Sequence, residues 1–312
     1  MDGLKIAVIG SGAMGLLFGA KLAQAGNDVT MVDVVPAVID RLNQEGIHLE
    51  FGGEDAYVPV KARYAQEMKE PADLAILFTK TLYSKAALDA CGSYVSPETW
   101  MLTMQNGLGN IELMERYVSR ERIIAGVTTF GADLKEPGHT ISSGRGYLKI
   151  MSANGQVSPG LERIDRVLKV AGLGSQIVDD VMVAIWEKVA FNAGINAVSA
   201  VCRVPCGGMG KVPEGAELCY KIAEETCRIA NAHGVPARAE EVKETLRKTI
   251  FELHKNHLTS MTQDVLNKRK TEAAFINGGV LQKARELGLE APYNETLFCL
   301  LHTIESTYDL QP

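Results

Sequence analysis

Apolar and polar positions in the first half of the chain follow two alternating periods. Residues 5–9 form a short apolar run ending in Gly10, typical of a buried parallel strand, and the alanine-rich stretch 13–25 predicts a helix that Gly26 ends. Further strands are predicted at 28–33, 47–51, 56–60, 74–78, 99–104 and 175–178. Further helices are predicted at 36–45, 82–91, 110–117 and 160–171, and the glycine-punctuated stretch 122–151 predicts short antiparallel strands. This alternation predicts an α/β fold built on a doubly wound parallel sheet.

After Asp179 the pattern changes to helical periodicity alone. Helices are predicted at 180–200, 214–233, 237–256, 258–268, 271–287 and 293–308, and no run of strand type remains. We therefore place a domain boundary near residue 178, between an α/β domain at 1–178 and an all-helical domain at 179–312.

Composition and charge narrow the class of protein. With 46% hydrophobic and 22% charged residues, the 312-residue chain is typical of a globular protein with a sizeable core. The net charge is −6 and no basic stripe is present, which argues against a nucleic-acid partner. No apolar run reaches the roughly 18–20 residues of a membrane-spanning helix, and the N-terminus leads into a predicted strand rather than a signal peptide. We therefore expect a cytoplasmic protein with no membrane partner.

The six cysteines form no CxxC pair, and no histidine lies at zinc-finger distance from them. Cys202 and Cys206, four residues apart, would make half of a metal site on a helix. The simpler interpretation is that they are reduced, partly buried small side chains. We expect no metal ion and no structural disulfide.

Residues 10–15 read Gly-Ser-Gly-Ala-Met-Gly, which is the G-x-G-x-x-G pattern of a dinucleotide-binding loop. The pattern is weak alone, but here it follows a predicted strand and opens a predicted helix, as such a loop requires. Gly10 allows the tight turn, Gly12 lets the backbone approach a pyrophosphate, and Gly15 lets the helix pack closely on the strand. The helix N-terminus favours the diphosphate anion. The sequence therefore predicts a Rossmann-type dinucleotide-binding domain at 1–178. The cofactor-binding residues of the loop are Gly10, Ser11, Gly12, Ala13, Met14 and Gly15.

Asp33 ends the second predicted strand and indicates which cofactor is used. A carboxylate at this position accepts hydrogen bonds from the adenosine ribose hydroxyls and would repel a 2′-phosphate. Val34 and Val35 supply no arginine to hold that phosphate. The sequence therefore favours NAD(H) over NADP(H). Lys80, after another predicted strand, argues for NADP(H) if it contacts the cofactor, and the alternative is a solvated loop lysine.

Lys188, Asn192 and Asn196 recur at a spacing of four in a stretch that is otherwise almost wholly apolar. Each step of four advances a helix by about 400°, so the three side chains form one polar stripe. Polar groups buried without partners are costly, so we expect this stripe to line a polar cleft rather than a dry core. The alternative is a surface stripe on an amphipathic helix.

Four motifs then occur in an order that resembles the ketopantoate reductase (2-dehydropantoate 2-reductase) family, over nearly the whole chain. The first is the glycine-rich loop, and the second is Gln105-Asn106-Gly107-Leu108-Gly109. The third is Trp186-Glu187-Lys188 with Asn192 and Asn196. The fourth is Ser260-Met261-Thr262-Gln263-Asp264, followed by Thr271-Glu272 and Ile276-Asn277-Gly278. The C-terminal motifs are far more specific than the glycine pattern. The resemblance implies a helical substrate and catalytic domain at 179–312, and a homodimer or a monomer.

The resemblance also implies a role for each matching residue. Lys188 matches the general acid that protonates the carbonyl oxygen as hydride arrives, and Glu272 matches the carboxylate that orients substrate and assists this transfer. Asn106 matches the asparagine at the nicotinamide end of the cofactor. The groups that bind the substrate's carboxylate and hydroxyl are matched by Asn192, Asn196 and Ser260. A cation with a transferable proton stabilises the negative charge that builds on the ketone oxygen. A first-turn helix position after Thr271 as N-cap is a second interpretation of Glu272.

Two departures from the family pattern bear on substrate and cofactor. Where members that bind a substrate hydroxyl often carry asparagine, three residues before the serine, this chain has His257, with Asn256 one position earlier. Asp33-Val34 stands where NADP-dependent members have an arginine. The leading hypothesis is a reductase that converts ketopantoate to (R)-pantoate in pantothenate biosynthesis. The alternatives are an NAD-dependent D-2-hydroxyacid (mandelate-type) dehydrogenase of this family acting on other branched or bulky 2-oxo acids, and a non-catalytic dinucleotide sensor. Lys188 with Glu272 argues against the sensor.

Overall fold

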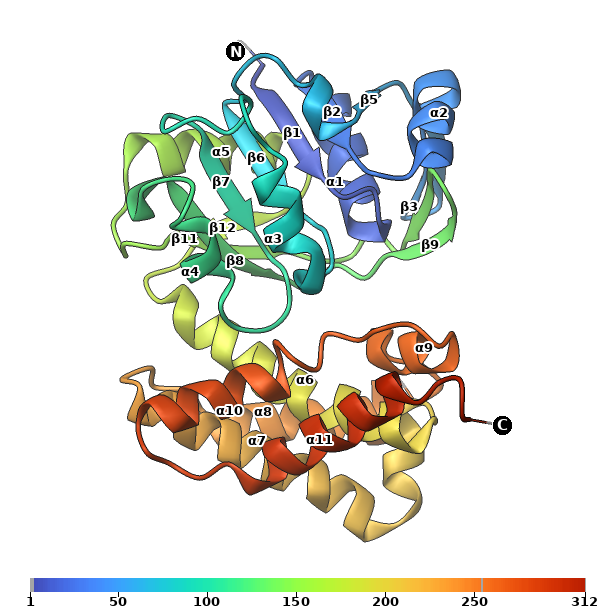
Figure 1. The fold of residues 1–312 in the computed structure, drawn as a ribbon, viewed down its shortest axis with the longest axis vertical. Coiled ribbons are helices and arrows are strands. Elements are labelled where there is room, and N and C mark those ends of the chain that lie inside the picture. The colour runs from blue at the N-terminus through green and yellow to red at the C-terminus, as the bar shows by residue number, and fades with distance from the viewer. Residues whose placement is uncertain (1–2, 254, 312) are drawn as a thin grey trace. The chain divides into compact units, whose positions relative to one another are not determined.

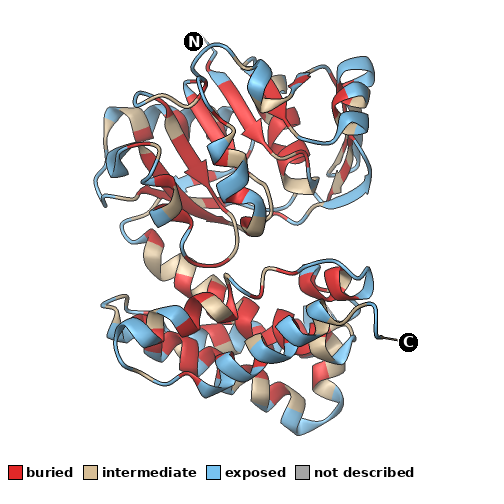
Figure 2. Ribbon diagram, in the orientation of Figure 1, coloured by how far each residue is buried: buried red, intermediate tan, exposed pale blue. Residues whose placement is uncertain are grey.

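A computed structural model describes residues 3–253 and 255–311, and the chain forms two compact units. The first unit comprises residues 1–105 and 110–181, and the second comprises 106–109 and 182–312. Figure 1 shows strands and helices in the first unit and helices alone in the second, and Figure 2 shows the central strands of the first unit as buried. An α/β N-terminal part followed by a helical C-terminal part confirms the predicted fold class. Residue 254, inside the predicted helix 237–256, lies outside the described residues, as do 1, 2 and 312.

The first unit is built on an eight-stranded sheet in the order β12-β11-β8-β7-β6-β1-β2-β5. Its strands are β1 (Lys5–Ile9), β2 (Asp28–Val32), β5 (Lys61–Arg63), β6 (Leu74–Leu77), β7 (Trp100–Thr103), β8 (Ile123–Thr128), β11 (Leu148–Ser152) and β12 (Ser175–Ile177). All neighbouring strands pair in parallel except β8 and β11. The central strands are apolar on both faces, as a sheet covered by helices on both sides requires.

Helices connect the parallel strands and cover the sheet. They are α1 (Ala13–Gln24), α2 (Pro36–Glu45), α3 (Thr81–Asp89), α4 (Asn110–Met114) and α5 (Pro159–Val170), with short 3₁₀ turns at Ala65–Glu67 and Arg120–Arg122. The chain runs outward from β1 through β2 to β5, then returns to β6 on the other side of β1. The strand order therefore reverses between β1 and β6, and ligands of open α/β sheets bind beside such a switch point, at the carboxyl ends of the strands.

A second, four-stranded sheet in the order β4-β3-β10-β9 packs against α1. Its strands are β3 (Ile47–Phe51), β4 (Glu54–Val58), β9 (Asp133–Glu136) and β10 (His139–Ser142). Gly19 of α1 approaches both Met31 of β2 and Ile47 of β3, and a Cβ there would lie 2.5 Å from the Met31 sulfur. The helix is therefore enclosed between the two sheets, and the opposite face of the small sheet carries polar side chains.

The stretch 122–151 departs from the prediction of short antiparallel strands. β8 joins the large sheet parallel to β7, and β10 pairs in parallel with β3. Within this stretch the pairs β8–β11 and β9–β10 are antiparallel, and its strands divide between the two sheets. The helix predicted at 110–117 ends at Met114, and the three-residue strand β5 was too short to show a pattern.

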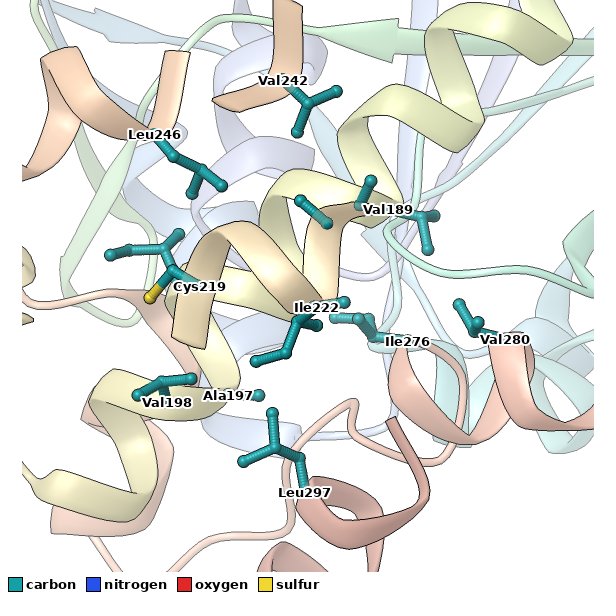
Figure 3. Close-up of a cluster of buried hydrophobic side chains, with 14 of the residues drawn as sticks. Val189, Ala197, Val198, Cys219, Ile222, Val242, Leu246, Ile276, Val280 and Leu297 are labelled. Carbon is teal, nitrogen blue, oxygen red and sulfur yellow. The ribbon is translucent and has the colours of Figure 1, made fainter. Parts of the chain in front are cut away.

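The second unit is a set of helices around one long central helix. Its helices are α6 (Val181–Cys202), α7 (Pro213–Ala232), α8 (Ala239–Lys248), α9 (Ser260–Leu266), α10 (Asn277–Glu286) and α11 (Pro292–Ser306), with a 3₁₀ turn at Cys206–Lys211 and a π turn at Thr249–Leu253. Figure 3 shows side chains of α6, α7, α8, α10 and α11 meeting in one apolar cluster. Gly194 lets α6 approach α7 closely, because a Cβ there would lie 2.9 Å from the Cys219 carbonyl oxygen.

Helix α6 is long and apolar enough to cross a membrane by length and composition, contrary to the expectation from the sequence. Its most apolar 18-residue stretch is 61% buried within the protein, and its apolar side chains belong to the core cluster. The core helix of a globular protein has the same composition. The helix therefore gives only weak evidence for a membrane span.

Three predicted helices of this unit are several residues shorter than expected, and the one predicted at 258–268 spans only Ser260–Leu266. The helix predicted at 271–287 begins only at Asn277, and residues 272–276 form turns. The helix predicted at 237–256 ends at Lys248 and passes into the π turn. All six cysteines are unpaired, as predicted, and Cys202 is exposed whereas Cys206 is buried.

Candidate active site

The glycine-rich loop connects β1 to α1, and each of its three glycines meets a different environment. Gly10 has a φ of +103°, and a Cβ there would lie 2.7 Å from the Thr79 amide nitrogen, in the loop after β6. A Cβ at Gly15 would lie 1.9 Å from the Gly10 carbonyl oxygen, so the start of α1 touches the end of β1. A Cβ at Gly12 would meet nothing within 4 Å. The open space lies at the N-terminus of α1, where a pyrophosphate is expected.

The polar groups at this helix N-terminus fit an anionic dinucleotide. Gly12 is the N-cap of α1, so no side chain caps the helix, and the first turn carries no acidic residue. The buried Ser11 hydroxyl has no hydrogen-bond partner among the described residues. Because a buried polar atom without a partner is costly, a ligand oxygen at this position would be favoured.

Asp33, directly after β2, is held by backbone donors. Its Oδ2 accepts a hydrogen bond from the Ser11 amide at 2.7 Å, and its Oδ1 accepts from the amides of Val34 and Val35 at 2.8 and 3.1 Å. The carboxylate is therefore fixed beside the glycine-rich loop. Val34, the next residue, is 80% exposed.

Gln105 connects the carboxyl ends of β6 and β7, and the sequence did not suggest this role. Its Nε2 donates to the Thr79 carbonyl at 2.5 Å and to the Ser84 hydroxyl at 2.7 Å, and its Oε1 accepts from Thr103 at 3.0 Å. These bonds fix the loop that carries Lys80, the N-cap residue of α3. The sequence feature that could have identified Gln105 is a polar residue at the end of a predicted strand, because the carboxyl ends of the strands surround the ligand in such sheets.

The glycine geometry predicts opposite outcomes for two matched substitutions. Gly15→Ala places a methyl against the Gly10 backbone, so we expect a loss of about 1–3 kcal/mol or more in the free energy of unfolding. Gly12→Ala meets open space, so we expect less than about 1 kcal/mol of destabilisation but at least about a tenfold rise in the Kd for NADH. Urea unfolding and NADH fluorescence titration measure the two effects. Equal destabilisation by both variants would contradict the expected division of roles.

Lys188 lies on α6 in the second unit, in a half-buried position. Burial lowers the pKa of its ammonium group to about 8, and the carboxylate of Glu272 opposes this shift. A lysine that titrates near pH 8 can both hold and release a proton under ordinary conditions. Asn192 and Asn196, one and two turns further along the same helix, are 6% and 8% exposed.

Asn106 connects two other polar residues of this unit. Its Nδ2 donates to Glu272 Oε2 at 3.2 Å, and its Oδ1 accepts from Asn192 Nδ2 at 3.4 Å. The segment 106–109 is counted with the second unit, and the Leu108 amide donates to the Phe275 carbonyl at 2.9 Å. The structure therefore brings Asn106, Asn192 and Glu272 together. Lys188 is close enough for the charge of Glu272 to raise its pKa.

Glu272 lies in a turn, so its alternative interpretation as a first-turn helix residue is wrong. The amides of Phe275 and Ile276 both donate to the Glu272 carbonyl. The hydroxyl and amide of Thr271, the expected N-cap, donate to Glu305 of α11, and the same hydroxyl accepts from the Ala273 amide at 3.1 Å. Helix α10 therefore begins only at Asn277, and Glu272 is half-buried beside Asn106.

The remaining sequence-predicted residues lie on or before α9. Ser260 is the first residue of α9 and is exposed, and His257 is exposed in the loop before it. The His257 carbonyl accepts from the Cys206 amide at 3.0 Å, which fixes the backbone of this loop. Asn256 is exposed as well. The roles proposed for Ser260 and His257 rest on the motif.

Asn277 of the C-terminal motif belongs to a buried hydrogen-bond network that joins helices. It is completely buried, and its Nδ2 donates to the Ala193 carbonyl of α6 at 3.4 Å and to Asn294 Oδ1 at 3.1 Å. Asn294 in turn donates to the buried carboxylate of Glu225, which also accepts the amides that open α11. This network fixes α10 and α11 against α6 and α7.

Comparison with known proteins identifies relatives over almost the whole chain. Residues 6–155 match the family described as Ketopantoate reductase PanE/ApbA, and residues 180–305 match the part described as Ketopantoate reductase PanE/ApbA C terminal. The 2-dehydropantoate 2-reductase of Archaeoglobus fulgidus is 32% identical over 308 residues, covering 97% of this chain and 98% of the relative. The enzyme of the same name from Pyrococcus horikoshii is 32% identical over 303 residues, with 97% and 98% covered.

Solved structures show the same fold. D-mandelate dehydrogenase with NADH and anilino(oxo)acetate superposes with a TM-score of 0.92 at 27% identity, covering 97% of this chain and 99% of that one. The 2-dehydropantoate 2-reductase of Geobacter metallireducens GS-15 gives a TM-score of 0.88 at 28% identity, with 96% and 99% covered.

Proposed function

Since this chain belongs to the ketopantoate reductase family of NAD(P)-dependent dehydrogenases and reductases, we propose that it reduces the 2-oxo group of ketopantoate to give (R)-pantoate. The arrangement that carries the proposal is the half-buried Lys188 of α6, near the Glu272 carboxylate that Asn106 holds through a 3.2 Å hydrogen bond. Desolvation lowers the pKa of Lys188 to about 8. A dinucleotide-binding module alone has no need of a proton donor in this state.

The chemistry assigns separate tasks to the two units. When bound, the reduced nicotinamide supplies the hydride, and the glycine-rich loop with Asp33 holds the dinucleotide. Lys188 donates its proton to the ketone oxygen as negative charge develops there. Glu272 keeps Lys188 protonated by its charge, and Asn106 holds Glu272 in place through the 3.2 Å hydrogen bond.

We assign substrate binding to polar residues of the second unit. Asn192 and Asn196 share the Lys188 face of α6, so amide donors line up beside the proton donor. Amide and hydroxyl donors suit the carboxylate and hydroxyl of a 2-oxo acid such as ketopantoate. Ser260 and His257 are assigned to the same task from the motif, and His257 replaces the asparagine expected for a hydroxyl contact.

A second candidate is reduction of other branched or bulky 2-oxo acids to D-2-hydroxy acids. The TM-score of 0.92 to D-mandelate dehydrogenase bound to NADH and a 2-oxo acid analogue favours it, together with His257. The proposed pocket would then accept an apolar group where ketopantoate has its hydroxyl.

A panel of 2-oxo acids tests the proposed function. The purified protein is mixed with NADH and ketopantoate, phenylglyoxylate or 2-oxoisovalerate, and the loss of NADH absorbance is followed. We expect the highest kcat/KM with ketopantoate, because a site built to bind a hydroxyl discriminates against analogues that lack it. A higher value with phenylglyoxylate selects the second candidate. NADH binding without turnover of any 2-oxo acid would indicate a sensor and would overturn both.

Cofactor preference gives a prediction of its own. We expect a higher kcat/KM with NADH than with NADPH, because the fixed Asp33 carboxylate repels a 2′-phosphate.

Val34→Arg adds a cation at an 80% exposed position, so we expect the ratio of kcat/KM values to shift at least about tenfold toward NADPH without loss of stability. This variant keeps Asp33, whose Oδ2 accepts a hydrogen bond from the Ser11 amide. The control is Val157→Arg, which adds the same charge at another exposed valine. Equal kcat/KM for both cofactors in the wild type would contradict the assignment of Asp33.

A further inference from the structure

Two histidines and two carboxylates gather on the face of the small sheet that points away from α1. His48 and Glu50 lie two residues apart on β3, so both side chains leave the same face. His139 of β10 is the register partner of His48, and Asp55 of β4 is the partner of Glu50. Residues paired in register share a face, so all four side chains lie together. None of them belongs to the residues assigned to the reaction.

The opposite face of the same strands shows why this one is polar. Ile47 and Leu49 of β3 are buried, and the Thr140 hydroxyl donates to the Ala13 carbonyl of α1 at 3.0 Å. These side chains cover α1, so the alternating positions must face outward. An outward face needs polar residues for solubility, but it does not need two imidazoles beside each other.

The imidazole rings are stacked, with ring centroids 3.8 Å apart and an angle of 19° between the planes. The Nε2 atom of His48 lies 2.7 Å from Asp55 Oδ1, and the Nε2 atom of His139 lies 2.8 Å from Glu50 Oε1. The ring of Tyr57 stacks on the other side of His48 at 4.3 Å. Both imidazoles therefore present the Nε2 edge to a carboxylate, and a shared metal ion would require the two stacked rings to tilt toward a common point.

We propose that His48, His139 and Glu50 bind a divalent transition-metal ion of the zinc class. One donor atom from each of these residues lies within 4.8 Å of the other two. Donors of a tetrahedral zinc site, each about 2.0–2.1 Å from the ion, lie about 3.3 Å from one another. The donor atoms must therefore move closer together through side-chain rotation when the ion binds. The Glu50 side chain is 39% exposed, whereas that of His48 is 15% exposed and stacks on the rings of Tyr57 and His139.

The donor set selects the class of metal. Two imidazoles with a carboxylate suit Zn²⁺ and its neighbours in the first transition row, whereas Ca²⁺ and Mg²⁺ prefer oxygen ligands alone. Asp55 is close enough to His48 to serve as a fourth ligand or to accept the hydrogen bond of the ring nitrogen that does not bind metal. The ion would join β3 to β10, whose neighbouring residue Thr140 contacts the first turn of α1.

Zinc binding to the full chain tests the site. After removal of metal with a chelator, isothermal titration with ZnCl₂ at pH 7.5 should show one saturable site. We expect His139→Asn and Glu50→Gln each to raise the Kd for Zn²⁺ at least tenfold, and Asp55→Asn to raise it about tenfold. Glu50→Gln retains an acceptor for His139, so it separates loss of charge from loss of structure. His302→Asn is the matched control, because His302 is an exposed histidine on α11 that stacks on Phe298.

Cobalt distinguishes this site from binding by exposed cysteines such as Cys202. Co²⁺ bound to His48, His139 and Glu50 should give visible ligand-field bands without the thiolate charge-transfer band near the ultraviolet. An unchanged Kd in His139→Asn, or a thiolate band in the wild type, would overturn the proposal. So would the absence of saturable zinc binding by wild-type protein that binds NADH. These readouts do not depend on turnover, so failure of the proposed reaction leaves them interpretable.

Discussion

Lys188→Ala should lower kcat by about 10²–10⁴-fold, the usual contribution of a positioned general acid. The helix should survive, because alanine is the best helix former and removing a buried ammonium group relieves its desolvation. KM for the 2-oxo acid and the Kd for NADH should change far less than kcat. Steady-state kinetics on the best substrate of the panel, with circular dichroism as the folding check, measures the effect.

The wild-type pH profile belongs to the same prediction. Only the protonated lysine donates a proton, so the rate of reduction should be high below the Lys188 pKa of about 8 and fall as pH rises through it. Lys221→Ala is the control, because Lys221 is an exposed lysine that pairs with Glu217 on α7. Near-normal turnover by a folded Lys188→Ala variant would show that another group donates the proton.

Glu272→Gln should lower kcat by about tenfold or more, which corresponds to about 1.4 kcal/mol in the activation barrier. Glutamine retains an oxygen that accepts from Asn106, so the turn at 272–276 should stay folded. The substitution removes the charge that raises the Lys188 pKa. The falling limb of the pH profile should therefore move to lower pH, to below about 8.

The shift of the limb separates a role through Lys188 from a structural role of Glu272. A variant that merely loosened the turn would lose rate at every pH and leave the limb in place. Glu286→Gln is the matched control, because it removes an exposed carboxylate that pairs with Lys283 on α10. NADH binding should be the same in both variants, because the glycine-rich loop belongs to the first unit.

Local patterns predicted the parts of the fold that depend on neighbouring residues in the chain. The strand at 5–9 and the helix at 36–45 match β1 and α2 residue for residue, because burial and a proline at the first helical position are local signals. The pairing of β8 with β7 rather than only with later strands was not predicted. Strand partners are chosen by the whole sheet, and a short strand pattern carries no information about them.

In the candidate site, too, the sequence predicted features that depend on nearby residues and missed those that depend on residues far away in the chain. The spacing of Lys188, Asn192 and Asn196 predicted one face of a helix, and α6 places them on one helix. Glu272 was assigned by resemblance, but its turn depends on Glu305, which is 33 residues away in the chain. His48 and His139 are farther apart still, and only the pairing of β3 with β10 brings them together. A single sequence does not reveal such contacts.

The short segment 106–109 sets a limit on how the protein can be divided. Gly107 has a φ of +88°, and its neighbour Leu108 donates its amide to Phe275, so the segment completes a body whose remaining residues begin at 182. An excised fragment starting at Met182 would lack Asn106, the hydrogen-bond partner of both Glu272 and Asn192. The helical half is thus not a portable module. Chimeras that exchange the helical unit between relatives must exchange residues 106–109 as well. Otherwise Asn106 would come from one protein and its partners Glu272 and Asn192 from another.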